Sequence, residues 1–154
     1  MNESQPKPST PGSWQHASLV SALGRWAWIA GLINGIIELF VALIGIGIGL
    51  LKNAVSPLLK PYSPVYDIWQ LIGAIILIFI SFAVLRPKFS NKCADQDWEA
   101  LYNWILPLGN TKIPWMLIWS IILTIFSWFY WGGVLVLLPA ILLIFMGPRP
   151  YNWS

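Results

Sequence analysis

The sequence predicts an all-α, polytopic integral membrane protein with about four transmembrane helices in a small bundle. Of its 154 residues, 57% are hydrophobic and only 10% are charged, whereas soluble domains carry about 25% charged residues. Long apolar stretches follow one another along the chain, and most of the 11 tryptophans lie near their ends. Because so few polar groups cannot cover a soluble domain of this size, we expect the lipid bilayer to surround the protein.

The chain begins with a polar segment, residues 1–24, that is rich in Pro, Ser and Gly. Closely spaced prolines disfavour helix and sheet, so we expect residues 1–13 to be flexible or polyproline-like. A cleaved secretory signal has a short apolar core near the start of the chain. The first apolar run here begins later and is longer, which favours a membrane span over a signal peptide.

Two expected spans, residues 26–51 and 68–85, lie in the first part of the chain. At 1.5 Å per residue they would be roughly 39 and 27 Å long, compared with a hydrocarbon core of about 30 Å. Lys52 follows the first run. The sequence Arg86-Pro87-Lys88 is expected to stop the second helix, because proline disrupts a helix interior.

Residues 95–106 are expected to form an amphipathic helix that lies flat in the membrane interface. Asp95 would cap its first turn, and Pro107 follows its end. The apolar residues recur at helical spacing, at Trp98, Leu101, Tyr102 and Ile105.

The last apolar stretch, residues 113–147, is too long for one straight span. Gly132-Gly133 is a strong break signal, which predicts spans at 113–130 and 134–147 joined by a tight hairpin. The second of these is short and contains Pro139, so a re-entrant segment is the alternative. Residues 149–154 would form a short tail.

The distribution of basic residues predicts the orientation. With four spans, one side of the membrane holds most of them, namely Lys7, Arg25, Arg86, Lys88, Lys92, Lys112 and Arg149, whereas the other holds Lys52 and Lys60. An excess of Lys and Arg marks the cytoplasmic side, so both termini are expected there. We expect the plasma membrane rather than an organelle.

Small residues form a row along one face of the first expected span, at Gly31, Gly35, Ala42, Gly45 and Gly49. Such residues let two helix backbones approach closely, so this face should pack against protein. Glu38 occupies the missing step of the row, and Asn34 lies one helical turn earlier. A charged side chain at this depth costs on the order of 3 kcal/mol, so we expect a protonated carboxyl that Asn34 hydrogen-bonds.

Glu38 has two interpretations. It could join helices by hydrogen bonds, with Gln70 or with Ser and Thr residues of other spans as partners, or it could exchange protons or a small cation. Proton relays use chains of ionisable groups, and no second charged residue lies within the expected spans. The sequence therefore favours the structural role.

These observations predict a small non-enzymatic membrane protein, a structural, accessory or assembly subunit that binds other membrane helices in a homo-oligomer or a larger complex. A transporter or channel subunit that uses Glu38 is the alternative. One Cys and one His exclude an internal disulfide and a Cys/His zinc cluster. No catalytic residues, metal, cofactor or nucleic-acid partner are expected.

Overall fold

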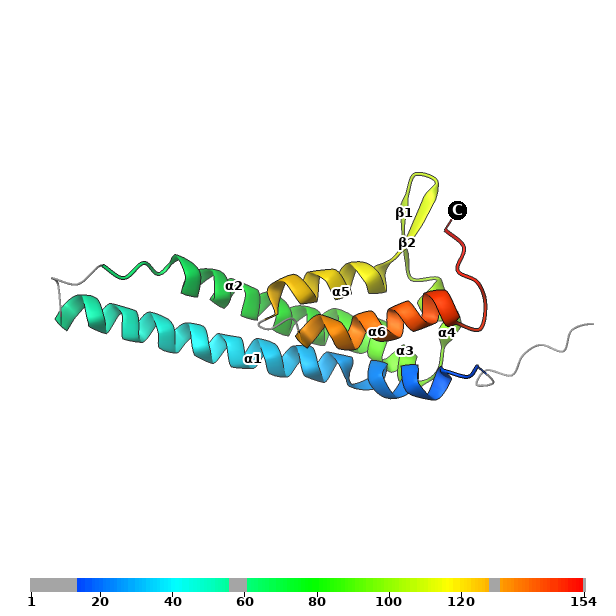
Figure 1. The fold of residues 1–154 in the computed structure, drawn as a ribbon, viewed down its shortest axis with the longest axis horizontal. Helices are drawn as coiled ribbons and strands as arrows, with labels where there is room; N and C mark the ends of the chain where they lie inside the picture. Colours follow the sequence, from blue (N-terminus) through cyan, green and yellow to red (C-terminus); the bar gives the residue numbers. More distant parts are fainter. Residues whose placement is uncertain (1–13, 56–60, 128–130, 154) are drawn as a thin grey trace, which may run out of the picture.

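The computed structural model describes residues 14–55, 61–127 and 131–153, which are mostly helical (Figure 1). Helix α1 (Ala17–Val55) lies antiparallel to a second long helix, which begins as α2 (Val65–Ile80). Two shorter helices, α5 (Trp115–Phe126) and α6 (Trp131–Met146), cover part of this pair. Helix α6 packs against α1 and α5, and α5 also touches α2.

Two helices are long and apolar enough to cross a membrane, as the sequence predicts for the first two runs: α1 and the continuous helix Val65–Ala94. Helix α1 has 39 residues and begins within the expected polar segment. Ala17, Val20 and Ser21 are buried there, because the start of α1 packs against α3 (Asn91–Ala94). The expected flexible residues 1–13 lie outside the described residues.

The expectation that Arg86-Pro87-Lys88 stops the second helix is wrong. The chain continues from α2 through a π-helix, η1 (Ser81–Ser90), into α3, with Pro87 inside η1. A π-helix pairs each N–H with the carbonyl five residues earlier, and the N–H of Asn91 bonds to the carbonyl of Arg86 in this way. Leu85 and Phe89 are buried on either side of the proline, so packing holds the helix together.

The expected helix at 95–106 is wrong over most of its length. Helix α4 (Trp98–Tyr102) has 5 residues, and Asp97, not Asp95, caps it by accepting a bond from the N–H of Ala100 at 3.1 Å. Its apolar residues are buried inside the protein instead of facing a membrane interface: Trp98, Leu101 and Tyr102.

A β-hairpin follows α4, where the sequence had indicated a helix end and the start of a span. Strands β1 (Ile105–Leu108) and β2 (Thr111–Pro114) pair antiparallel, with Ile105 opposite Pro114. Gly109 has a φ of 61° in the two-residue turn, a conformation that glycine adopts without strain and that suits tight hairpins. The hairpin projects from one end of the helices (Figure 1).

The last apolar stretch is divided into two helices, as predicted, but the division comes before Gly132-Gly133, and both glycines lie in the first turn of α6. Helix α5 already ends at Ser127, which is extended. A side chain at Gly133 would collide with Thr124, and its Cβ would lie 2.6 Å from the carbonyl oxygen of Ser120. The glycine therefore serves close packing between α5 and α6. The expected end of the third span, 128–130, lies outside the described residues.

Candidate functional site

The interface between α1 and the helix Val65–Ala94 holds most of the small residues that the sequence analysis singled out. Added Cβ atoms on α1 would meet side chains of the opposite helix at each of these glycines: Ser81 at Gly31, Ile78 at Gly35, Asp67 at Gly45 and Tyr62, just before α2, at Gly49. Ala42 is fully buried on the same face. We call this interface the glycine seam. It is occupied by the protein's own second helix.

The closest backbone approach in the seam is at Gly35. A Cβ there would lie 2.9 Å from Cγ1 of Ile78, and 3.1 Å from both the carbonyl oxygen of Ala74 and the backbone nitrogen of Ile78. Backbone atoms cannot move aside as a flexible side chain can. A larger residue at position 35 would therefore push the two helices apart.

Glu38 lies in the seam and is 2% exposed. The amide Nδ2 of Asn34 donates a hydrogen bond to its Oε1 at 2.8 Å. Glu38 also makes a further interaction. Its carboxyl group thus lies inside the protein.

A second acid, Asp67, belongs to the same interface, although no second charged residue was expected within the spans. It lies two residues into α2, one residue before the expected start of that span, and its carboxylate faces Gly45. The hydroxyl of Tyr62 donates a hydrogen bond to Oδ2 of Asp67. This bond, with a smaller contribution from burial, raises the pKa of Tyr62 to about 12. The tyrosine is therefore a neutral donor at physiological pH.

The contacts along the seam also give the alignment of the two helices. Gly35 lies beside Ala74 and Ile78, whereas Gly45 lies beside Asp67. Because the helices are antiparallel, each residue forward along α1 corresponds to one residue backward along the second helix. This register places Gln70 level with Ala42, one helical turn from Glu38. Gln70 thus stands between the two acids along the seam.

Two buried polar atoms in this region lack a hydrogen-bond partner among the residues that the structure describes. They are Oε1 of Gln70 and Oγ of Ser81. Ser81 is fully buried and begins the π-helical segment, opposite Gly31. Buried polar groups are nearly always paired, so these two atoms are available to a proton donor, a water molecule or a cation.

Polar groups therefore follow the seam from one end toward its middle: Tyr62, Asp67, Gln70, Glu38, Asn34 and Ser81. Chemically, the carboxyls can take up or release a proton, and the amide and hydroxyl oxygens can accept hydrogen bonds. The sequence signal that would have revealed Asp67 is its spacing. It precedes Gln70 by three residues and so shares a helix face with it.

Comparison of the chain with protein-family models, with curated proteins and with solved structures finds no match.

Proposed function

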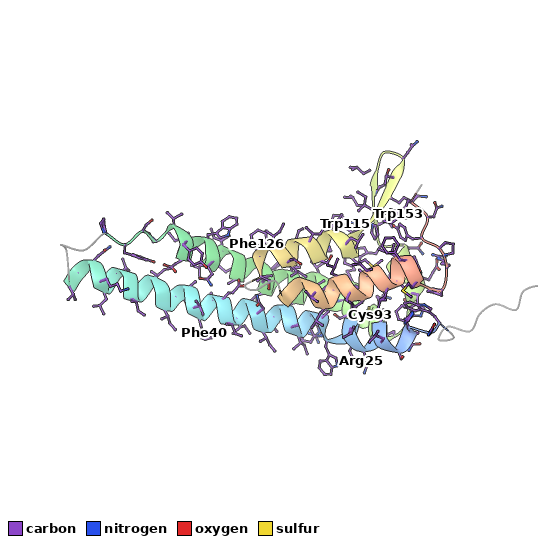
Figure 2. All side chains as sticks on the ribbon, viewed as in Figure 1. Arg25, Phe40, Cys93, Trp115, Phe126 and Trp153 are labelled. Carbon is purple, nitrogen blue, oxygen red and sulfur yellow. The ribbon has the colours of Figure 1, made fainter. Side chains whose placement is uncertain are left out.

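We propose that this chain is an integral plasma-membrane protein in which α1 and the helix Val65–Ala94 cross the bilayer. The length and hydropathy of these two helices support the proposal. Large apolar side chains are also exposed along α1 away from the seam, for example Ile37, Phe40 and Ile44. Figure 2 shows such side chains, Phe40 among them, on the free side of α1. Water would solvate this surface poorly, whereas lipid tails or other helices would cover it.

Helices α5 and α6 have 12 and 16 residues, which correspond to about 18 and 24 Å. Both lengths fall short of a hydrocarbon core of about 30 Å. These lengths favour a helical hairpin that enters the membrane and returns to the same side. They argue against a bundle of four spans. Irregular backbone is tolerated at such depth where protein covers it, and α5 and α6 pack against α2 and α1.

Either arrangement leaves both termini on one side, which we propose to be the cytoplasmic side. Basic residues gather at the end of the protein that carries α3, α4 and the hairpin, namely Arg86, Lys88, Lys92, Lys112 and Arg149. Lys52 lies near the opposite end of α1. The positive-inside rule then places the hairpin end in the cytoplasm.

A topology measurement tests this arrangement. Single cysteines at Ser63 and Asn110, each in a Cys93→Ser background, should react with a membrane-impermeant maleimide from opposite sides of sealed vesicles. Labelling of both positions from the same side would overturn the proposed crossing.

For the function itself, we propose a non-enzymatic structural or accessory subunit of a larger membrane assembly. The observation that carries this proposal is the exposed apolar face of α1, whose large side chains include Phe40 at 60% exposure. The small-residue face cannot supply the contact, because the protein's own second helix fills it. A partner would instead bind the bulky face.

Photo-crosslinking in the native membrane tests the accessory role. A crosslinking amino acid at Phe40 should capture another polypeptide, whereas the same group at Phe89, an aromatic residue that is 1% exposed, should capture none. Adducts with lipid alone at Phe40, together with migration of the solubilised protein as a lone monomer, would contradict the role.

A second candidate function is exchange of protons or a small cation by Glu38. The observation that favours it is the line of polar groups in which Asp67 and Gln70 approach Glu38 along the seam. Ionisable groups in series are typical of proton relays.

Reconstituted flux separates this function from a structural role. Glu38→Gln keeps hydrogen-bonding capacity but removes the ionisable group, so it should abolish flux while the protein stays folded. Glu99→Gln is the matched control, because Glu99 is an exposed acid of α4 outside the seam. Flux that is unchanged in Glu38→Gln would eliminate the exchange function.

A further inference from the structure

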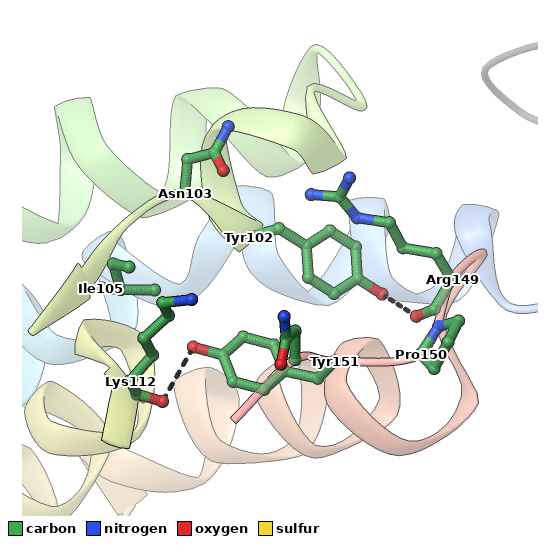
Figure 3. Close-up of a pocket in the computed structure, with 8 residues that line it drawn as sticks. Tyr102, Asn103, Ile105, Lys112, Arg149, Pro150 and Tyr151 are labelled. Atoms are coloured by element: carbon green, nitrogen blue, oxygen red, sulfur yellow. Dashed lines mark hydrogen bonds between the residues drawn. The ribbon is translucent and has the colours of Figure 1, made fainter. Parts of the chain in front are cut away.

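A polar cavity of about 440 Å³ lies at the hairpin end of the protein, apart from the glycine seam. It is formed by the end of α4, both hairpin strands and the segment after α6. Its lining includes Tyr102, Lys112, Arg149 and Tyr151. Figure 3 shows these side chains converging from three separate parts of the chain. The cavity is therefore a product of the tertiary fold.

Two cations reach this cavity from different elements. Lys112 extends from β2, and Arg149 extends from the segment after α6, with the ring of Tyr102 between them (Figure 3). The guanidinium carbon of Arg149 lies 4.7 Å from the centre of the Tyr102 ring. No Asp or Glu is among the described residues that line the cavity. Two cationic side chains therefore line the cavity.

The two tyrosine hydroxyls fix the walls. The single hydroxyl proton of Tyr102 is shared between the carbonyl oxygens of Leu143 at 2.8 Å and Arg149 at 2.9 Å, and Tyr151 donates to the carbonyl oxygen of Lys112 at 3.2 Å. Burial raises the pKa of both tyrosines. Both hydroxyls therefore stay neutral at physiological pH and add no negative charge to the cavity.

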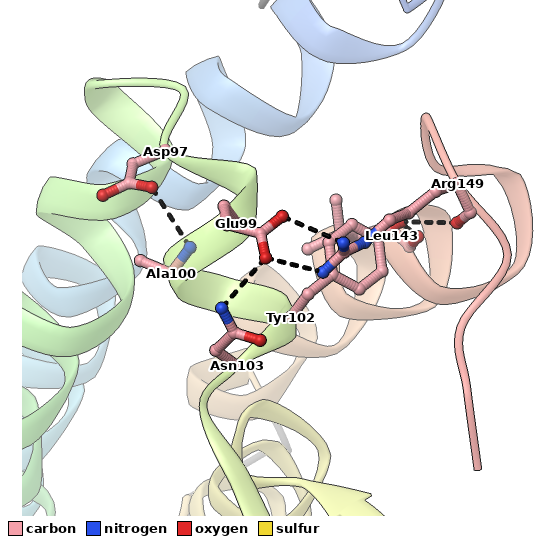
Figure 4. A network of polar contacts seen from close by, with 7 residues as sticks. All are labelled: Asp97, Glu99, Ala100, Tyr102, Asn103, Leu143 and Arg149. Atoms are coloured by element: carbon pink, nitrogen blue, oxygen red, sulfur yellow. Dashed lines mark hydrogen bonds and ion pairs between the residues drawn. The ribbon is translucent and has the colours of Figure 1, made fainter. Parts of the chain in front are cut away.

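An acid, Glu99, pairs with Arg149 just outside the cavity. Its carboxylate pairs with the guanidinium at 3.0 and 3.1 Å and also accepts a bond from Nδ2 of Asn103 at 3.0 Å (Figure 4). The side chains of Arg149 and Glu99 are both substantially exposed, at 49% and 63%. Because both groups are open to solvent, water and salt screen this bidentate pair, and an incoming anion can compete with Glu99 for the guanidinium.

We propose that this cavity binds a phosphate group, with Lys112 and Arg149 as its cationic partners. Guanidinium and ammonium groups are the usual ligands of phosphate oxygens, and the arginine fork can bind two of them. The source is either the headgroup of an anionic phospholipid or a free phosphate compound. The lipid source depends on the proposed membrane crossing, which puts this end of the protein beside the cytoplasmic headgroups. Binding of free phosphate does not depend on it.

The first test measures lipid retention by the full chain. Protein reconstituted in phosphatidylcholine vesicles with a minor fraction of phosphatidic acid is extracted and examined by native mass spectrometry. The protein should retain phosphatidic acid in preference to phosphatidylcholine, and Lys112→Gln should lower that retention about tenfold, as expected for loss of a charged hydrogen bond. Lys52→Gln, the same charge change at the other end of the protein, should have no effect.

The second test uses inorganic phosphate. Its addition to protein in neutral detergent should raise the melting temperature of the wild type and not that of Lys112→Gln. Stabilisation by phosphate without selective lipid retention would assign the site to a free phosphate compound. This result would stand even if the topology measurement rejected membrane crossing.

A variant that should bind more tightly distinguishes a loss of binding from a folding defect. Glu99→Gln removes the competing acid, so it should increase phosphatidic acid retention or phosphate affinity several-fold. The proposal is overturned by either of two results. One is the absence of both anion selectivity and phosphate stabilisation in the wild type, and the other is an equal loss of binding in Lys52→Gln and Lys112→Gln.

Discussion

The two helix pairs of this protein both use glycine for close packing, but they differ in length. Along α1, the glycines accept side chains of the second long helix, including Asp67 and Tyr62. Between α5 and α6, Gly133 meets the side chain of Thr124 and the carbonyl oxygen of Ser120. The long pair provides a scaffold with polar groups buried in it, whereas the short pair covers part of that scaffold. Each pair includes a glycine that lies against backbone atoms, Gly35 in the long pair and Gly133 in the short pair.

The largest expected loss of stability comes from placing a larger side chain at Gly35, between the two long helices. Gly35→Leu should destabilise the protein by about 3 kcal/mol, because the added atoms meet backbone atoms of Ala74 and Ile78. Gly47→Leu is the control, since a Cβ there meets no described atom within 4 Å. Thermal unfolding in detergent measures both. Equal stability of the two variants would refute the close approach at Gly35.

A larger side chain between α5 and α6 should cost less stability and should disturb the structure more locally. Gly133→Ala should cost about 2 kcal/mol through its collision with Thr124 and the Ser120 carbonyl. Cys93 of α3 is fully buried against Gly24 of α1, so it reports on the long pair. Its thiol should stay unreactive to maleimide in Gly133→Ala and become reactive in Gly35→Leu. Reactivity in both variants would mean that the two pairs unfold together.

The attachment of α4 to the end of α6 should contribute still less to the stability of the protein. Tyr102→Phe removes the hydrogen bonds to the carbonyls of Leu143 and Arg149, and one such bond is worth about 1 kcal/mol. Tyr66→Phe is the control, because Tyr66 is 65% exposed at the other end of the protein. If the melting temperatures of the two variants fall by the same amount, α6 is not anchored through Tyr102.

The smallest expected effect is the pH response of the turn before α4. The hydrogen bond from Lys92, together with that from the N–H of Ala100, lowers the pKa of Asp97. A lowered folded pKa stabilises the protein above the unfolded value of about 3.9, and this contribution is lost as the pH falls through the folded value. Asp97→Asn should therefore flatten the acid limb of a stability profile slightly. A steeper loss of stability at acid pH in the variant would contradict the stabilising role of ionised Asp97.

Hydropathy predicted the helical character and the two long apolar helices, because burial in lipid or protein demands apolar residues whatever the detailed packing. The sequence did not predict the course of the chain at Pro87, and it placed the break in the last apolar stretch slightly too late. Pro87 is a local stop signal that lies inside a helix held together by tertiary packing, whereas Gly132-Gly133 lies at the start of α6, shortly after the break. The hairpin was missed because the apolar residues from Trp98 to Ile105 recur at helical spacing, which extended the predicted helix into the first strand. The turn at Gly109 was therefore not recognised.

The polar site could be predicted only in part. Helical spacing placed Glu38 beside the glycines and next to Asn34, and the structure has the expected bond between them. Asp67 and Tyr62 were missed because they lie at the edge of an apolar run, where charge usually indicates a loop. The cavity around Tyr102 joins residues far apart in the chain, and no local pattern records such proximity.

A disulfide test addresses the central claim, that the small-residue face of α1 packs against the second helix of the same chain. A Cβ at Gly31 would lie 3.4 Å from that of Ser81, close to the Cβ separation of about 3.8 Å in disulfides. In a Cys93→Ser background, Gly31→Cys with Ser81→Cys should form a disulfide within one chain under mild oxidation, whereas Gly47→Cys with Ser81→Cys should not. Disulfide-linked dimers from the first pair, with no intrachain bond, would contradict the account.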